Sequence, residues 1–313
     1  MQQPRDVLTP ESLSMLQAIA DAGSFAAAAR TMGMVPSALT YRVRQIEDVL
    51  DVLLFDRSAR HARPTPAGLE LLREGQHILQ AVDTMANRVK RVATGWEPQL
   101  TIAADSIISK PVLLELCESF FALAPSTRLR LREEVLSGTL EALTCGLADL
   151  AIGVADISSH ADVHSKPLGD VRFVFAVAPH HALAGAIEPV PDSILRAHRA
   201  VAVADSVQRG DGLTIGLFGG QEVLTVASME DKLQAQLRGL GGGFLPECMA
   251  REYIASGKLV VRQTERTIRL VRPHYAWRAT GKSHMGRALQ WWLKQLESAV
   301  TRQALLSHHA PAV

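Results

Sequence analysis

This chain of 313 residues has few cysteines, a net charge close to zero and no long apolar run. Its three cysteines are isolated, odd in number and set among apolar residues, which favours buried thiols in a reducing compartment, with a redox-sensing pair as the alternative. The formal net charge is only +1, whereas a protein that coats DNA without sequence preference needs a strongly basic chain. No run approaches the roughly 18 apolar residues of a membrane span, and the amino terminus lacks a charged start followed by an apolar core. We therefore expect a cytoplasmic protein that does not act at a membrane.

The common catalytic and metal-binding motifs are missing as well. His-Glu-x-x-His, the Walker loop, Gly-x-Ser-x-Gly and cysteine pairs at metal-binding spacing do not occur. The glycine-rich stretch 239–244 lacks the spacing of a dinucleotide-binding loop and precedes a strand-like segment, so it favours tight packing. The sequence predicts no catalytic residue, no metal site and no cofactor, and hence a protein that is not an enzyme.

Residues 23–47 have the pattern of two short helices joined by a tight turn. Ser24 can cap the first helix, whose alanine-rich stretch has high helix propensity, and Gly33 ends it. Pro36 suits the first position of a second helix because its φ is already helical and its missing N–H would be unpaired there. This shape fits the major groove of DNA.

The second helix has one apolar and one polar side. Leu39, Val43 and Ile46 recur at spacings of four and three and are expected to face inward. Hydroxyl and guanidinium groups on the other side suit phosphates and base edges. The outward residues are Ser37, Thr40, Tyr41, Arg42 and Arg44. An ordinary amphipathic hairpin with a solvated charged side is the alternative.

The flanking residues extend this pattern. Leu13, Leu16 and Ile19 precede it on one helical face, and the segments 50–57 and 63–68 follow it with Leu-Phe-x-Arg and Thr-x-x-Gly spacings. In this order and spacing, the first ninety or so residues resemble the DNA-binding end of a LysR-type transcriptional regulator. The resemblance implies a winged helix-turn-helix domain over residues 1–64.

Two positions depart from the family pattern, and a basic run follows the helices. Met32 stands where Leu is usual, and Pro36 takes a place often held by a base-contacting Gln, so the base contacts are expected from the residues that follow Pro36. The resemblance also implies that Arg57, in the wing, contacts the backbone or the minor groove. A solvated loop is the alternative for the wing. The predicted DNA-binding residues are Ser24, Ser37, Thr40, Tyr41, Arg42, Arg44, Arg57 and Arg60.

A long linker helix is predicted over residues 65–95. Thr65 and Pro66 form a strong helix start and Gly95 a stop, which gives a helix on the order of 40 Å long. Small and apolar residues recur along it at the spacing of a coiled-coil seam, so we expect a homodimer; a helix packed on its own chain is the alternative. The predicted seam consists of Leu72, Gly75, Leu79, Val82, Ala86, Val89 and Ala93. A two-fold dimer would bind an inverted-repeat site on double-stranded DNA, and the resemblance implies a further step to a tetramer.

From residue 96 onward, apolar runs alternate with helical stretches, as expected for a largely parallel sheet covered by helices. The predicted strands are 100–104, 129–132, 150–154, 173–177, 201–203 and 223–226. Stretches 134–143, 146–153 and 237–246 resemble signatures of the LysR effector domain, which implies a two-lobed α/β fold like that of periplasmic binding proteins. We expect this domain over 96–300, with lobe I at 96–169 and 271–300, lobe II at 170–270, and a flexible tail at 301–313.

Ligands of such folds sit beyond the carboxyl ends of strands and near helix N-termini. That rule selects the candidate effector-binding residues Asp105, Ser106, Ser137, Thr139, Asp205, Ser206, Ser228 and Phe244. Each hydroxyl has the alternative role of a plain helix cap. The carboxylates of Asp105 and Asp205 would disfavour an anionic effector if both faced the crevice. The variant recognition helix also resembles a family branch that responds to aromatic compounds, so a neutral or hydroxylated aromatic effector is expected.

The sequence thus predicts a sequence-specific DNA-binding regulator controlled by a small molecule bound between two lobes. Its expected partners are operator DNA, the effector, further copies of itself and RNA polymerase. A solute-binding module and an enzyme built on the same two-lobed fold are the alternatives. A signal for export would favour the solute-binding module, and a set of catalytic residues would favour the enzyme.

Overall fold

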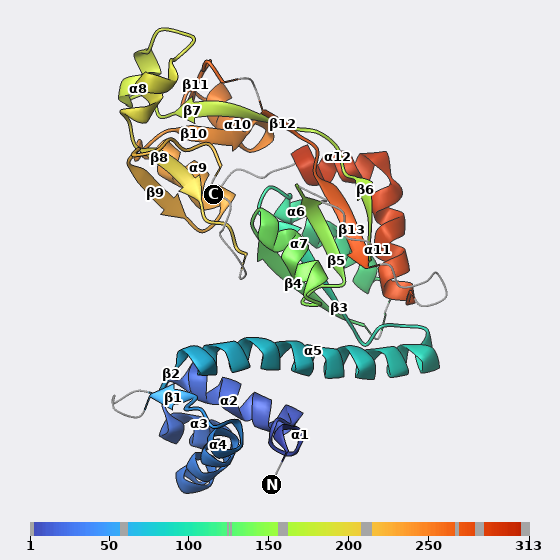
Figure 1. Ribbon diagram of the computed structural model, residues 1–313. Helices are drawn as coiled ribbons and strands as arrows, with labels where there is room; N and C mark the ends of the chain where they lie inside the picture. The colour runs from blue at the N-terminus through green and yellow to red at the C-terminus, as the bar shows by residue number, and fades with distance from the viewer. Residues whose placement is uncertain are drawn as a thin grey trace. The chain divides into compact units, whose positions relative to one another are not determined.

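The computed structural model describes residues 3–56, 62–123, 125, 127–155, 162–207, 215–266, 269–278 and 285–307 (Figure 1). The chain forms two compact units, Met1–Arg88 and Val89–Val313. Within the described residues, no helix is both long enough and apolar enough to cross a membrane.

The first unit is built from short helices and a small hairpin. Before the long helix described below, its elements are α1 (Pro4–Val7), α2 (Pro10–Ala22), α3 (Phe25–Thr31), α4 (Pro36–Leu50), β1 (Phe55–Asp56) and β2 (Arg63–Pro64). Thr9 and Ser24 cap α2 and α3 by accepting backbone N–H groups, and Gly33 adopts a positive φ of 64° in the turn before α4. The predicted pair of helices with a tight turn is therefore confirmed.

The first unit has its own apolar core. Leu16 and Ile19 of α2 pack with Leu39, Val43 and Ile46 of α4. Strands β1 and β2 pair in antiparallel fashion beside this core. The three inward positions predicted for the second helix are thus all buried.

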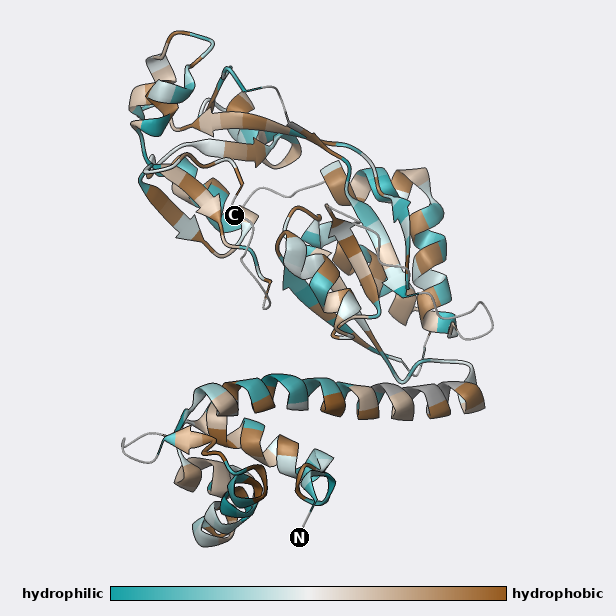
Figure 2. Cartoon of the chain, viewed as in Figure 1, coloured by the Kyte–Doolittle hydropathy of each residue, from teal (hydrophilic) through white to brown (hydrophobic). Residues whose placement is uncertain are grey.

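Helix α5 (Pro66–Thr94) begins and ends where the sequence predicts. Its first turns pack closely against the other helices and the hairpin of the first unit. A Cβ on Gly68 would lie 2.1 Å from the carbonyl oxygen of Leu54, so only glycine fits there, and one on Gly75 would lie 2.9 Å from the end of the Leu13 side chain. Further along, large apolar side chains are exposed, and Figure 2 shows apolar residues recurring toward the C-terminal end of the helix.

The first sheet of the second unit forms lobe I. Its strands and helices are β3 (Gln99–Asp105), α6 (Lys110–Phe121), β4 (Arg128–Glu134), α7 (Ser137–Thr144), β5 (Leu150–Val154), β6 (Val163–Pro167), β13 (His274–Arg278) and α11 (Arg287–Glu297). The strand order is β4-β3-β5-β13-β6, in which β3 pairs in parallel with β4 and β5 while β13 runs antiparallel to β5 and β6.

Lobe II lies between β6 and β13 in the sequence. Its elements are β7 (Val171–Val177), the 3-10 helix η1 (Ala182–Gly185), α8 (Asp192–Arg196), β8 (Ala200–Val203), β9 (Val223–Val226), α9 (Met229–Leu237), β10 (Gly243–Pro246), α10 (Glu247–Ala255), β11 (Val260–Arg262) and β12 (Arg269–Val271). Strand β7 pairs in antiparallel fashion with β10, β11 and β12, and β8 pairs in parallel with β9. Buried residues from both lobes form one continuous apolar cluster.

All six predicted strands are present, but the expectation of a largely parallel sheet is wrong for lobe II. An apolar run shows that a strand is covered on both faces, and β7 is largely buried in this way. An apolar run does not indicate whether the neighbouring strands are parallel or antiparallel to it. The pairing direction depends on the side from which the chain returns to the sheet.

The expected flexible tail also differs from the structure. Helix α12 (Ala299–Ser307) continues through residues 301–307 and buries Leu305 and Leu306. The carbonyl oxygen of Leu305 accepts a hydrogen bond of 2.8 Å from the backbone N–H of Ser109, just before α6. Two adjacent apolar side chains in a short polar segment gave too weak a signal for a packed helix. Residues 308–313 lie outside the described part.

Candidate functional sites

One side of α4 is polar and exposed, opposite the buried side chains that hold the helix in place. Ser37, Tyr41 and Arg44 fall at spacings of four and three and therefore share one helical face. The Tyr41 side chain is 63% exposed, and its hydroxyl accepts a hydrogen bond of 3.2 Å from Gln45 Nε2. Ser37 and Arg44 are also exposed. This face offers hydroxyl, phenol and guanidinium groups together.

The other predicted DNA-binding residues lie at the edges of that face or make contacts within the chain. The Thr40 hydroxyl donates to the carbonyl oxygen of Pro36 at 2.9 Å, and Arg42 forms an ion pair with Glu11 of α2. Ser24 accepts a hydrogen bond from the backbone N–H of Ala27 as the cap of α3. The two predicted wing residues, Arg57 and Arg60, lie outside the described residues.

Glu47 has a structural role that no sequence pattern indicates. Its buried carboxylate accepts hydrogen bonds from the backbone N–H groups of Leu54 at 2.9 Å and Phe55 at 3.4 Å. The end of α4 therefore fixes the start of the β1–β2 hairpin. No local spacing in the sequence connects Glu47 to these two residues.

A cavity of about 270 Å³ lies between the lobes of the second unit. Lobe I contributes residues at or just beyond the ends of β3, β4 and β5, among them Asp105, Ser106 and Val135. Lobe II contributes most of the wall, which is mainly apolar. Its aromatic members are Phe173, Phe175, Phe218 and Phe244. Its polar members are His198, Arg199, Gln221, Lys232 and Arg266. Such a space, apolar with a few polar groups, is typical of a small-molecule site.

Asp105 and Ser106 reach this cavity from the end of β3. The Asp105 carboxylate accepts hydrogen bonds from the backbone N–H groups of Ile107 at 3.0 Å and Leu136 at 2.9 Å, and from the Thr139 hydroxyl at 3.3 Å. Burial raises the pKa of Asp105 to about 7, although these hydrogen bonds oppose the shift. The buried Ser106 hydroxyl has no hydrogen-bond partner among the described residues.

Four predicted effector-binding residues make contacts within the chain and do not line the cavity. Ser137 donates to the carboxylate of Asp205, which also accepts from the backbone N–H of Gly138 at 3.2 Å. The Ser206 hydroxyl accepts from the backbone N–H of Val135 at 2.8 Å and lies 2.8 Å from a carboxylate oxygen of Glu134. The Thr139 hydroxyl bonds Asp105, as described above. The bonds of Asp205 and Ser206 join the segment after β8 to the end of β4 and the start of α7, so they hold the two lobes together.

The last two predicted residues have different positions. Ser228 caps α9, where its hydroxyl accepts the backbone N–H of Asp231 at 3.1 Å, and it does not line the cavity. Phe244 of β10 does line the cavity and meets Phe175 edge to face, with ring centroids 5.4 Å apart. The structure therefore brings together Asp105, Ser106 and Phe244, but not the other five candidates.

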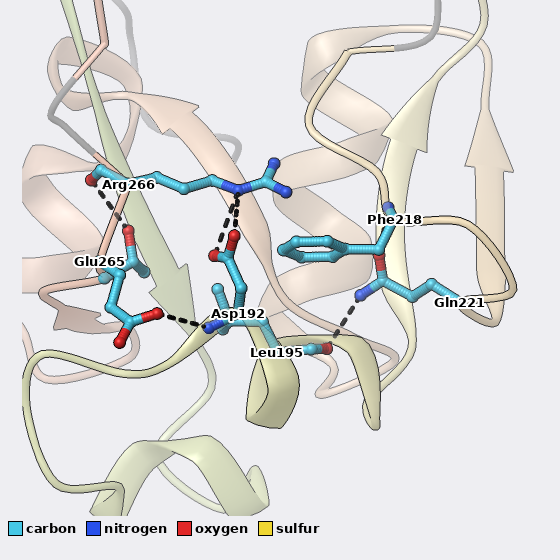
Figure 3. Close-up of polar contacts among 7 residues, drawn as sticks. Asp192, Leu195, Phe218, Gln221, Glu265 and Arg266 are labelled. Atoms are coloured by element: carbon cyan, nitrogen blue, oxygen red, sulfur yellow. Dashed lines mark hydrogen bonds and ion pairs between the residues drawn. The ribbon is translucent and has the colours of Figure 1, made fainter.

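A group of lobe II residues around Phe218 was missed by sequence reasoning. Figure 3 shows Arg266 beside Asp192 and Phe218, with its guanidinium carbon 3.7 Å from the centroid of the Phe218 ring. Gln221 Nε2 donates to the carbonyl oxygens of Leu195 and His198, both at 2.9 Å. These residues come from three separate segments, so no spacing in the sequence connects them.

A helix-turn-helix with an exposed polar face, followed by a two-lobed domain with a mainly apolar cavity between its lobes, defines a ligand-binding regulator of transcription. Family models support this class. The model of the bacterial regulatory helix-turn-helix protein, lysR family, matches residues 10–69, and that of the LysR substrate binding domain matches residues 93–301. The chain belongs to the LysR family and is a DNA-binding transcriptional regulator with an effector-binding domain.

Individual relatives match over nearly the whole chain. The probable HTH-type transcriptional regulator YhaJ of Escherichia coli (strain K12) is 37% identical over 292 residues, which cover 92% of this chain and 96% of YhaJ. The HTH-type transcriptional activator AllS of Klebsiella pneumoniae is 31% identical over 256 residues, covering 81% and 95% of the two chains. The crystal structure of CbnR, a LysR family transcriptional regulator, shares the fold with a TM-score of 0.58 at 17% identity, over 93% of this chain and 99% of CbnR.

Proposed function

We propose that this regulator binds an inverted-repeat operator as a dimer and that a small molecule in the cavity between its lobes controls that binding. The observation that carries the proposal is the cavity, because a concave and mainly apolar space with a few polar groups, at the junction of two lobes, is typical of a small-molecule site. Its lining joins groups from both lobes, so an occupant would influence how the lobes close.

The polar face of α4 supports the operator contacts. We assign the central contacts to Ser37, Tyr41 and Arg44, since these side chains point away from the buried side of the helix. An arginine can form a bidentate contact to guanine, and hydroxyls can bond phosphate or base edges. Thr40 and Arg42 are assigned to the edges of the contact, because each already has a partner within the chain.

The exposed apolar residues of α5 support the dimer. Ile78, Val82, Met85, Val89 and Val92 are exposed and recur at alternating spacings of four and three. This stripe shares Val82 and Val89 with the seam predicted from the sequence. At the start of the predicted seam, Leu72 packs against the core of the first unit and Gly75 is buried against it.

The size and lining of the cavity support a small effector with an apolar body, which includes the aromatic class expected from the sequence. At about 270 Å³ the cavity is smaller than the range of roughly 300–1,000 Å³ typical of drug-sized ligands. An effector alters DNA binding only if it binds two arrangements of the lobes with different affinity. We propose that the protein regulates transcription without catalysing a reaction. We also propose that it contacts RNA polymerase.

The operator contacts are tested by replacing Arg44 with Ala. An operator is first selected from random-sequence DNA duplexes with the full-length chain, and binding is then measured by fluorescence anisotropy. We expect roughly tenfold or greater weakening, because a bidentate arginine–guanine contact is worth about 1–3 kcal/mol. The control is Arg73→Ala, which removes an exposed arginine of α5 that is paired with Glu70 and Glu74. Equal affinities for wild type and Arg44→Ala would contradict the assignment.

A further inference from the structure

We infer that Arg266 is the anion-recognition residue of the cavity and that the effector is a small organic carboxylate. The carboxylate would lie against the Arg266 guanidinium in lobe II, and the apolar body would lie among the phenylalanines. This inference rests on the proposed function and specifies the chemistry of the same cavity. It differs from the sequence-based expectation of a neutral effector.

The guanidinium of Arg266 is held in place from two sides. Its Nε donates to both carboxylate oxygens of Asp192, at 3.3 and 3.4 Å. Its plane lies over the Phe218 ring, 3.7 Å from the centroid. Asp192 is in turn fixed by the Glu265 carboxylate, which accepts its backbone N–H at 3.2 Å (Figure 3). The guanidinium is therefore oriented before any ligand arrives.

The terminal nitrogens of this guanidinium remain available to a ligand. Among the described residues, neither has a hydrogen-bond partner, and Figure 3 shows both pointing away from Asp192. Arg266 lines the cavity, and its side chain is 31% exposed. Two parallel N–H groups at fixed geometry match the two oxygens of a carboxylate. A lysine at this position would offer a point charge without that geometry.

The other charges of the cavity also favour an anion. Lys232 and Arg199 line the wall with Arg266, and Arg199 is engaged with the Glu222 carboxylate at 2.7 and 3.0 Å. Asp105 is the one acidic residue among the described residues of the lining. Asp205, the second carboxylate that argued against an anion, is bonded to Ser137 and the backbone of Gly138 instead.

Lobe I offers a contact for the other end of such a ligand. The Ser106 hydroxyl lies in the cavity wall, is buried and lacks a partner among the described residues. An unsatisfied buried hydroxyl is costly, and a hydroxyl or carbonyl group on the ligand would satisfy it. A ligand held by Arg266 in lobe II and by Ser106 in lobe I would bind the closed arrangement of the lobes more tightly than an open one.

The test uses full-length protein and pairs of probes that differ only in charge. Benzoate, para-hydroxybenzoate and indole-acetate are each compared with the corresponding carboxamide by calorimetric titration of wild type, Arg266→Gln, Arg266→Lys and Arg272→Gln. Arg272 is the control because it is exposed, pairs with Asp170 and does not line the cavity. We expect at least one carboxylate to bind wild type roughly tenfold or more tightly than its amide. Arg266→Gln should abolish that preference, and Arg266→Lys should restore only part of it.

Three outcomes decide the inference. Loss of the carboxylate preference in Arg266→Gln, with amide affinity unchanged and Arg272→Gln like wild type, supports it. If amides bind wild type as tightly as carboxylates and change its operator affinity, the anion assignment is wrong while the proposed function stands. If no probe of either kind binds wild type or changes its operator affinity, both the anion assignment and the proposed cavity function fail for ligands of this size.

Discussion

At the scale of single residues, Asp105 has the least ordinary environment in the cavity. Its buried carboxyl accepts three hydrogen bonds, yet its pKa is raised to about 7 because burial penalises the charged form more than these bonds favour it. Unfolded, the same group ionises near 3.8. Between those two values the folded chain holds a proton that the unfolded chain has released. The contribution of Asp105 to stability therefore falls as the pH rises from about 4 to about 7.

Replacing Asp105 with Asn tests this shift. The variant loses hydrogen bonds at every pH, but its side chain has no proton to release. The difference in unfolding free energy between the variant and wild type should therefore shift in favour of the variant as the pH rises from 4 to 7. The gain is at most about 4 kcal/mol, because one pKa unit corresponds to about 1.4 kcal/mol. Urea unfolding followed by tryptophan fluorescence reports this, since all four tryptophans lie in the second unit. Parallel stability profiles for the two proteins would show that the pKa is not raised.

At the scale of elements, the start of α7 and the segment after β8 approach each other unusually closely. A Cβ on Gly138 would lie 2.0 Å from the Ser206 hydroxyl oxygen and 2.9 Å from the Ser206 carbonyl carbon. The same two segments are joined by the hydrogen bonds of Ser137, Asp205 and Ser206. The junction of the lobes thus depends on a glycine as well as on its polar side chains.

Gly138→Ala should push these segments apart. We expect about 1–3 kcal/mol lower stability of the second unit, the usual cost of inserting a methyl group into a packed site. Tryptophan fluorescence during urea unfolding measures this cost. Gly185→Ala is the matched control, because a Cβ there meets no atom within 4 Å and Gly185 has no positive φ. A Gly138→Ala protein as stable as Gly185→Ala would mean that the junction can relax.

Local signals explain which elements could be predicted from the sequence. The bounds of α5 follow from Thr65, Pro66 and Gly95, and the six predicted strands follow from apolar runs. The pairing directions in lobe II and the packed helix α12 depend on distant contacts, such as that of Leu305 with Ser109, which no local pattern encodes.

The candidate sites divide in the same way. Periodicity predicted the outward face of α4, because each position on a helix fixes a direction. The strand-end rule found Asp105 and Ser106, which line the cavity, but it could not separate them from Ser137 and Ser228, which serve the fold. No local pattern marks Arg266, because its partners Asp192 and Phe218 lie at sequence separations that only the folded chain brings together.

At the scale of the whole molecule, regulation requires that the second unit influence how two first units meet DNA. Helix α5 is the covalent connection between the units, so its exposed stripe bears on both dimerisation and operator spacing. Two linked recognition helices bind with avidity, since the second contact becomes intramolecular once the first has formed. A chain that cannot dimerise should therefore keep its helix-turn-helix but lose most of its operator affinity.

Val89→Asp tests this dependence, because Val89 is 68% exposed and lies at the centre of the C-terminal part of the stripe. Each dimer would place two carboxylates in an apolar seam, so we expect about a hundredfold weaker self-association or more, at a cost of about 1.4 kcal/mol for each carboxylate. Gln76→Asp adds the same charge to the opposite side of α5 and should leave dimerisation unchanged. Sedimentation velocity gives the oligomeric state, and anisotropy with full-site and half-site duplexes gives the operator affinity. Because a monomer contacts only one half-site, Val89→Asp should lose the preference of wild type for the full site and should bind the half-site as tightly as wild type does. If the variant stays dimeric, the dimer interface lies elsewhere on the chain.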